Sequence, residues 1–261
     1  YPGIAGMVHS YDVVIFVLMV GSVEGIAFWT AAVLLPNIIS NSALVSVAVY
    51  AKLLKEGKMD DLRRNITQIF FFAFPLSAIV IVFAEPGLFI LNPIYQIVYP
   101  IVIIITFHAI LNTLSTVFQS ILKGVETVDM DEESTFKQYI KSKLFRIPTL
   151  LLIQYSAYII LLMIMLWVAS PDANLIDLLT YWSIILLSTQ IPITICYYIM
   201  IRKHLQITFE LGMILKYLII SLVVFSSTYY LIEQFLEYDN NNFVFIPNVL
   251  LFIMIGIFGY I

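Results

Sequence analysis

IPTLLLIQYSAYIILLMIMLWVA, residues 147–169, contains no Asp, Glu, Lys or Arg and is almost entirely apolar. An α-helix needs about 20 consecutive apolar residues to cross the hydrocarbon core of a bilayer. Soluble helices usually alternate apolar and polar faces instead. The stretch therefore predicts a transmembrane helix.

Similar apolar runs lie on both sides of this stretch. The chain of 261 residues is 61% hydrophobic and 11% charged, and its mean hydropathy is +0.99. A soluble domain has about 25% charged residues. We therefore expect an all-α, multi-pass transmembrane helical bundle. The sequence predicts about eight transmembrane helices, at roughly 2–20, 26–51, 66–84, 99–122, 147–169, 175–200, 211–232 and 244–261.

Basic residues gather in the second, fourth and sixth connections between these helices. Alternate connections lie on one side of a bilayer, and the positive-inside rule places that side in the cytoplasm. We therefore expect a protein of the cell (cytoplasmic) membrane with cytoplasmic basic loops. The net charge of −4, with basic groups confined to loops, does not indicate a nucleic-acid partner. The predicted topology determinants are Lys52, Lys55, Lys58, Arg63, Arg64, Lys141, Lys143, Arg146, Arg202 and Lys203.

Aromatic residues gather near the other ends of the predicted helices. Tyr and Trp are enriched at membrane–water interfaces, so we interpret these residues as an anchoring belt. Its members are Tyr95, Tyr99, Trp167, Tyr181, Trp182, Tyr229, Tyr230 and Tyr238.

No pattern of a known catalytic site appears in the sequence. It has no HExxH, no GxSxG and no phosphate-binding glycine loop. The single cysteine, Cys196, permits no disulfide within the chain, and the three histidines are far apart in sequence. The sequence therefore predicts a protein that is not an enzyme, with no metal site and no bound cofactor.

Asp12 lies in the middle of the first predicted helix, three residues after His9 and on the same helical face. A charged residue at the centre of a transmembrane helix costs about 2.5–3.5 kcal/mol on insertion scales. We therefore expect Asp12 to face a cavity or a partner rather than lipid. Two interpretations stay open: a structural contact with another helix, or a role in a substrate or ion pathway.

Amide side chains recur within the predicted helices. They are interpreted either as the lining of a polar path or as hydrogen-bonding links between helices, each worth about 0.6 kcal/mol. Internal prolines at Pro36, Pro75 and Pro192 are expected to bend three of the same helices. The candidate cavity-lining amides are Asn37, Asn41, Asn112, Gln119, Gln154 and Gln190.

The first half of the chain resembles a known family of transporters. A helix with an acidic residue is followed by a long helix ending in SALVSVAVYAKLLKEGKMDDLRRNITQ, and then by FFFAFPLSAIVIVFAEPGLFIL with its internal proline. The turn NPIYQIVYPIVII and a helix ending in SILKGVET come next. Over residues 1–125 this succession resembles the C-terminal half of the Wzx-like polysaccharide and lipid-linked oligosaccharide flippases. These belong to the multidrug/oligosaccharidyl-lipid/polysaccharide exporter superfamily.

The matching motifs are a basic loop with Leu62-Arg63-Arg64 and a turn with Asn92 and Tyr95, where the family's glycine is replaced by Asn92-Pro93. The resemblance implies a six-helix lobe at residues 1–200 and two appended helices at 201–261. It further implies that an N-terminal lobe of the same protein is missing from this sequence. Its partners would be the lipid bilayer and a lipid-linked sugar.

The resemblance implies transport by alternating access between two lobes. Some relatives couple transport to Na⁺ or H⁺ through an acidic residue on the first helix of this lobe, and Asp12 is the residue that matches. Two alternatives are kept open. One is a cation-coupled multidrug exporter of the same superfamily, and the other is a catalytic or non-catalytic subunit of a membrane complex.

Overall fold

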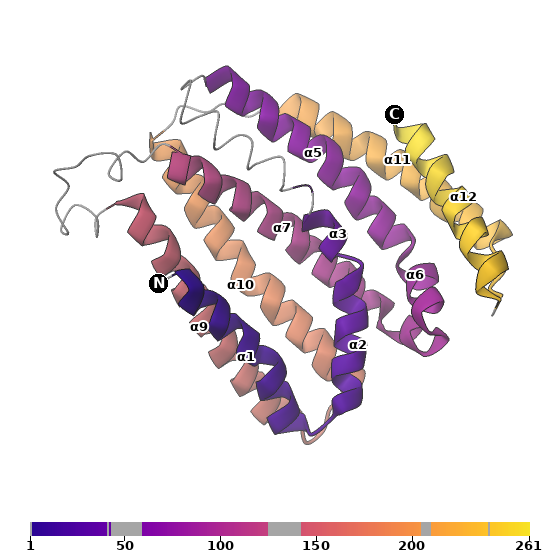
Figure 1. The fold of residues 1–261 in the computed structure, drawn as a ribbon, viewed down its shortest axis with the longest axis horizontal. Helices are drawn as coiled ribbons and strands as arrows, with labels where there is room; N and C mark the ends of the chain where they lie inside the picture. The colour runs from indigo at the N-terminus through magenta and orange to yellow at the C-terminus, as the bar shows by residue number, and fades with distance from the viewer. Residues whose placement is uncertain (1, 41, 43–58, 125–141, 205–209, 240) are drawn as a thin grey trace.

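Long helices make up nearly all of the structure (Figure 1). The computed structural model describes residues 2–40, 42, 59–124, 142–204, 210–239 and 241–261, and in these ranges it contains no β-strand. The predicted all-α fold class is confirmed. The helices are α1 (Pro2–Val20), α2 (Val23–Leu34), α3 (Asn37–Ser40), α5 (Met59–Val82), α6 (Ala84–Leu91), the 3₁₀ helix η2 (Pro93–Val98), α7 (Tyr99–Gly124), α9 (Lys143–Ala169), α10 (Leu175–His204), α11 (Leu211–Phe235) and α12 (Asn242–Tyr260).

Six helical segments of the described chain are long and apolar enough to cross a membrane. A seventh is obtained when α5 and α6, which meet at a bend of 63°, count as one span. The number of about eight predicted from the sequence is therefore not reached among the described residues. The six segments are Gly3–Val20, Pro93–Gly124, Lys143–Ala169, Leu175–Lys203, Gly212–Phe235 and Asn242–Tyr260.

The predicted span 26–51 differs most from the structure. The helix α2 ends at Leu34, a turn follows at Leu35 and Pro36, and α3 begins at Asn37. Pro36 has no N–H for the carbonyl four residues earlier, and its ring crowds that turn. The next amides bond only three residues back, as in Ile39 N–H to the Pro36 carbonyl at 3.0 Å. Residues 41 and 43–51 of this predicted span lie outside the described residues.

Pro75 interrupts the hydrogen bonding of α5 without breaking the helix. Its missing N–H leaves the Phe71 carbonyl without its usual partner within the helix. The hydroxyl of Tyr260, at the end of α12, donates to that carbonyl at 3.0 Å. A neighbouring helix thus satisfies a polar group that the proline exposes, as membrane proteins require.

The helix contacts fall into two main groups, one around α7, α9 and α10 and the other around α5 and α11. The helix α1 packs along α9, and α10 packs against both α7 and α9, while α2 and α3 contact α7. The helix α11 packs along α5 and α12. In Figure 1 the pair α11 and α12 accordingly lies beside α5 and α6, apart from α1 and α9.

Every Lys and Arg of the described chain lies near one end of the bundle. They occur at the start of α5, the end of α7, the start of α9, the end of α10 and the second turn of α11, and Figure 1 shows these termini on the same side. The segregation agrees with the predicted alternation of connections. Of the predicted determinants, Lys52, Lys55, Lys58 and Lys141 lie outside the described residues.

One predicted belt residue belongs instead to the core. Trp182 is 0% exposed and stacks on Trp29 at a ring distance of 3.9 Å, with Phe16 packed at 5.0 Å. Other predicted belt residues do face outward, since Trp167 is 77% exposed and Tyr230 is 62% exposed. The sequence gives the position of an aromatic residue along the helix, whereas the packing of neighbouring helices decides whether it faces lipid.

Candidate functional site

A polar cavity of about 250 Å³ lies among α1, α2, α3, α7, α9 and α10. We call it the central cavity, because Asp12, Asn112, Tyr158 and Gln190 each lie near the middle of their helix. The other residues that line it are His9, Trp29, Val33, Pro36, Asn37, Ser40, Ile105, His108, Ala109, Gln154, Tyr155, Leu186 and Thr189.

Asp12 is buried at the side of the cavity, with 5% of its surface exposed. Its Oδ2 accepts a hydrogen bond from the Tyr158 hydroxyl at 2.9 Å, and its Oδ1 accepts from the Val13 N–H at 2.7 Å. Both carboxylate oxygens therefore have a donor. A carboxylate away from water requires such partners.

The Tyr158 hydroxyl is itself held by a second donor. The Trp182 indole N–H donates to it at 2.5 Å, so the oxygen accepts from α10 and donates to α1. The side chains of Asp12, Tyr158 and Trp182, which these hydrogen bonds connect, are each at most 5% exposed. Asp12, Tyr158 and Trp182 thus join three helices through one polar contact.

His9 packs beside this chain of hydrogen bonds. Its ring stacks on Tyr158 at 5.5 Å and meets Tyr155 edge-on at 4.8 Å. His108 lines the cavity from α7. Among the described residues, the lining of the cavity therefore includes one carboxylate and two imidazoles.

A second chain of hydrogen bonds starts from the amides. The Gln154 side-chain amide on α9 donates to Gln190 Oε1 at 2.7 Å, and Gln190 Nε2 donates to Ser115 Oγ at 2.8 Å. Ser115 and Thr194 share a hydrogen bond of 2.8 Å. These four buried side chains link α7, α9 and α10, so Gln154 and Gln190 both line the cavity and connect helices.

The structure brings together most of the predicted site residues. Asp12 and the four amide residues Asn37, Asn112, Gln154 and Gln190 line the central cavity. Gln119 lies two turns beyond Asn112 on α7, is partly exposed and does not line the cavity, while Asn41 lies outside the described residues.

Sequence reasoning missed the importance of Tyr158, Trp182 and His108. Spacing is the signal that could have found two of them: Tyr158 follows Gln154 by four residues, and Asn112 follows His108 by four. Residues four apart share one face of a helix. The sequence could therefore have predicted a polar face on α7 that includes His108 and Asn112, and one on α9 that includes Gln154 and Tyr158.

No lysine or arginine of the described ranges lines the cavity. No group of three His, Cys, Asp or Glu side chains that could hold a metal ion occurs in the part of the chain that the structure describes. The cavity offers hydrogen-bond donors and acceptors, one carboxylate and several aromatic faces. The chemistry of these described residues suits a proton, a monovalent cation or a hydroxyl-bearing group.

The chain matches no protein-family model, no curated protein and no solved structure.

Proposed function

We propose that this protein is a membrane transporter of the flippase type, which moves lipid-linked oligosaccharide or polysaccharide precursors across the cytoplasmic membrane by alternating access. One observation carries the proposal: a cavity lined by a carboxylate, imidazoles and amides lies at the middle of an apolar helical bundle. Transporters commonly bind substrate and coupling ions near the membrane midplane, beside interrupted helices. The interruption at Pro36 lines this cavity.

The size of the cavity limits what it can hold. Its volume of about 250 Å³ is below the roughly 300–1,000 Å³ of sites for drug-sized ligands. It therefore suits one sugar unit, or a coupling ion with water, and not a whole oligosaccharide. In this proposal the remainder of the substrate and the cationic ligands of its pyrophosphate lie in a second lobe.

Asp12 is the proposed coupling residue, with Na⁺ or H⁺ as the ion. The Tyr158 hydroxyl holds the carboxylate in place, and His9 packs against the same tyrosine. A change in the charge of Asp12 would alter a hydrogen bond that joins α1 to α9. Such a contact gives ion binding a direct effect on the packing of two helices.

A cation-coupled multidrug exporter is the second candidate. The observation that favours it is the proximity of Asp12 to the aromatic rings of His9, Tyr155 and Tyr158, since carboxylates and aromatic faces both attract cationic drugs. The two functions differ in substrate, so transport assays with both substrates on the same vesicles can distinguish them.

The test is a leaflet-exposure assay with full-length protein in vesicles and a fluorescent lipid-linked sugar. Flipping should require the protein and should fall at least tenfold in Asp12→Asn, because an amide cannot take up or release the coupling charge. Gln119→Leu, a polar-to-apolar change outside the cavity, is the matched control. Transport of a cationic dye without flipping would favour the exporter. Undiminished, ion-dependent flipping by Asp12→Asn would exclude its coupling role.

A further inference from the structure

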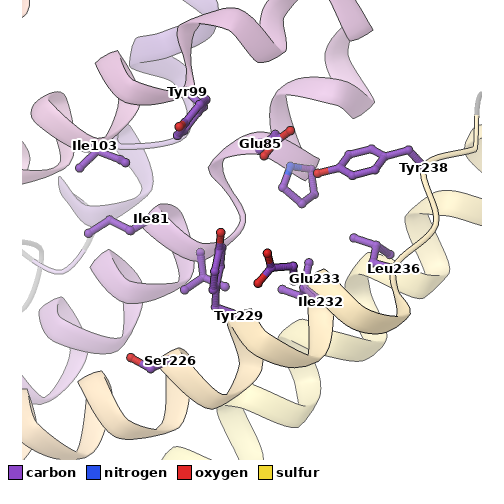
Figure 2. A pocket seen from close by; sticks show the side chains of 12 residues that line it. Ile81, Glu85, Tyr99, Ile103, Ser226, Tyr229, Ile232, Glu233, Leu236 and Tyr238 are labelled. Carbon is purple, nitrogen blue, oxygen red and sulfur yellow. The ribbon is translucent and has the colours of Figure 1, made fainter.

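A second and larger hollow, of about 590 Å³, lies between the bend of α5 and α6, the start of α7 and the end of α11. We call it the α6–α11 cleft. Its polar lining includes Glu85, Glu233, Tyr99, Tyr229 and Tyr238, and Figure 2 shows these side chains around one open space. It shares no lining residue with the central cavity.

The cleft carries two acidic side chains, and among the described residues no lysine or arginine lines it. Glu85 extends from α6 and Glu233 from α11, and both side chains are exposed. Gln96 donates to Glu85 in a long contact of 3.4 Å. Glu233 makes no hydrogen bond or ion pair within the described chain. In Figure 2 its carboxylate points into the open space.

The tyrosines supply aromatic faces and neutral hydroxyls. Burial, followed by the charge of Glu85 and then Tyr229, raises the pKa of Tyr238 to about 12. The phenol therefore stays protonated at physiological pH. Tyr238 also packs against Phe89 at 5.0 Å and Phe245 at 5.4 Å, which fixes its ring at the edge of the cleft.

The kind of cation can be argued from the lining. Ca²⁺ takes six to eight oxygen ligands, whereas this cleft offers two carboxylates and much apolar surface from Ile81, Ile232 and Leu236. An organic ammonium group is more complementary to this lining than a metal ion. Its charge can face the carboxylates and aromatic rings, and its carbon atoms can contact the apolar side chains. The volume also exceeds what a bare metal ion needs.

We propose that the α6–α11 cleft binds an organic ammonium group through Glu85, Glu233 and the faces of Tyr99 and Tyr229. Two sources can present this group: a free amine such as choline, or the headgroup of a zwitterionic phospholipid. This inference goes beyond the proposed transport function and does not depend on it, because the cleft is separate from the central cavity.

The first experiment measures binding of radiolabelled choline to full-length protein in detergent. The comparison ligand is the uncharged isostere of choline, in which a tertiary butyl group replaces the trimethylammonium group. Choline should bind and the isostere should not compete. Glu85→Gln and Glu233→Gln should each weaken choline binding about three- to fivefold, and Tyr229→Leu by about threefold.

Glu237→Gln is the matched control, because it removes the same charge from a residue that is exposed near the end of α11 and does not line the cleft. It should leave choline binding unchanged. Thermal unfolding of each variant checks that the fold is retained. The proposal is overturned if choline and its isostere bind equally, if Glu237→Gln has the same effect as Glu233→Gln, or if Ca²⁺ binds at the two carboxylates and displaces choline at micromolar concentration.

A second experiment identifies the source of the ammonium group. Native mass spectrometry compares retention of phosphatidylethanolamine and phosphatidylcholine with that of phosphatidylglycerol. Selective retention that is lost in Glu233→Gln and displaced by choline identifies the headgroup as the ligand. Choline binding without selective lipid retention identifies a free amine. Absence of both overturns the proposal.

Discussion

The Tyr158 hydroxyl donates a hydrogen bond of 2.9 Å to the Asp12 carboxylate and accepts one from the Trp182 indole. One phenol oxygen thus satisfies a buried acid on α1 and a buried N–H on α10. Without the Tyr158 hydroxyl, the buried Asp12 carboxylate and the buried Trp182 N–H would each lose a hydrogen-bond partner. Tyr158 should therefore matter for stability as well as for any function of Asp12.

Tyr158→Phe should lower the free energy of unfolding by about 1–3 kcal/mol, the cost of leaving buried polar groups unsatisfied. The change removes one oxygen and preserves the ring that packs against His9. Thermal unfolding in detergent measures the effect. The control is Tyr181→Phe, which removes a hydroxyl from a tyrosine that is 44% exposed on α10. Equal effects of the two substitutions would contradict the role assigned to Tyr158.

The contact between Tyr260 and the Phe71 carbonyl gives a second prediction. Tyr260→Phe should destabilise the packing of α12 on α5 by about 1 kcal/mol, because the carbonyl exposed by Pro75 then has no donor. Hydrogen exchange of α12 amides should report the loss locally.

Pro75→Ala provides the internal control for this contact. It supplies an N–H four residues after Phe71, so the helix itself can satisfy the carbonyl. In the Pro75→Ala background, Tyr260→Phe should have a much smaller effect, and a double-mutant cycle measures the difference. Simple additivity of the two substitutions would show that the contribution of Tyr260 does not depend on the carbonyl that Pro75 leaves without an intrahelical donor.

Orientation in the membrane gives a third prediction. The chain has one cysteine, and with Cys196→Ser a new cysteine can be placed at either end of the bundle. Gly212→Cys lies at the basic end, where an added Cβ meets nothing within 4 Å, and Asp172→Cys lies in the exposed turn between α9 and α10. In intact cells, a membrane-impermeant maleimide should label Asp172→Cys and should label Gly212→Cys only after permeabilisation. The reverse result would invert the proposed topology.

Sequence patterns predicted the helices better than their faces. The uncharged run at 147–169 corresponds to α9, Lys143–Ala169, because length and hydropathy alone determine such a span. The span predicted at 26–51 does not appear as one helix in the described residues, because Pro36 ends the hydrogen bonding of α2. A proline within a predicted helix signals a bend, but its neighbours decide whether the helix continues, as the continuous α10 with Pro192 shows.

The candidate site was predictable in part. The cost of a charge at a helix centre predicted that Asp12 would find a partner, and it does so in Tyr158. The partner itself was not predictable, because it comes from a helix 146 residues away. Trp182 was expected in the interfacial belt, and its burial depends on the packing of α1, α2 and α10 around it.

Titration of Tyr238 gives the last prediction. Its pKa of about 12 should appear in the ultraviolet difference between wild type and Tyr238→Phe, a subtraction that removes the other tyrosines. Glu85→Gln should lower this pKa toward the ordinary value of 10.0, without reaching it, because burial is the larger cause. Glu233→Gln should leave it unchanged, since that carboxylate is not among the causes of the shift.

The raised pKa also fixes the direction of a stability change with pH. Above pH 10 the unfolded chain loses this proton first, while the folded protein keeps it until about pH 12. The folded state therefore loses relative stability as the pH rises through this interval, and Tyr238→Phe should make the decline less steep. The Glu85→Gln variant should lower the upper limit of this interval and leave its lower limit, the pKa of the unfolded chain, unchanged. A wild-type titration at the ordinary tyrosine pKa would show that Tyr238, which is 44% exposed, is neither partly desolvated nor close to Glu85 in solution.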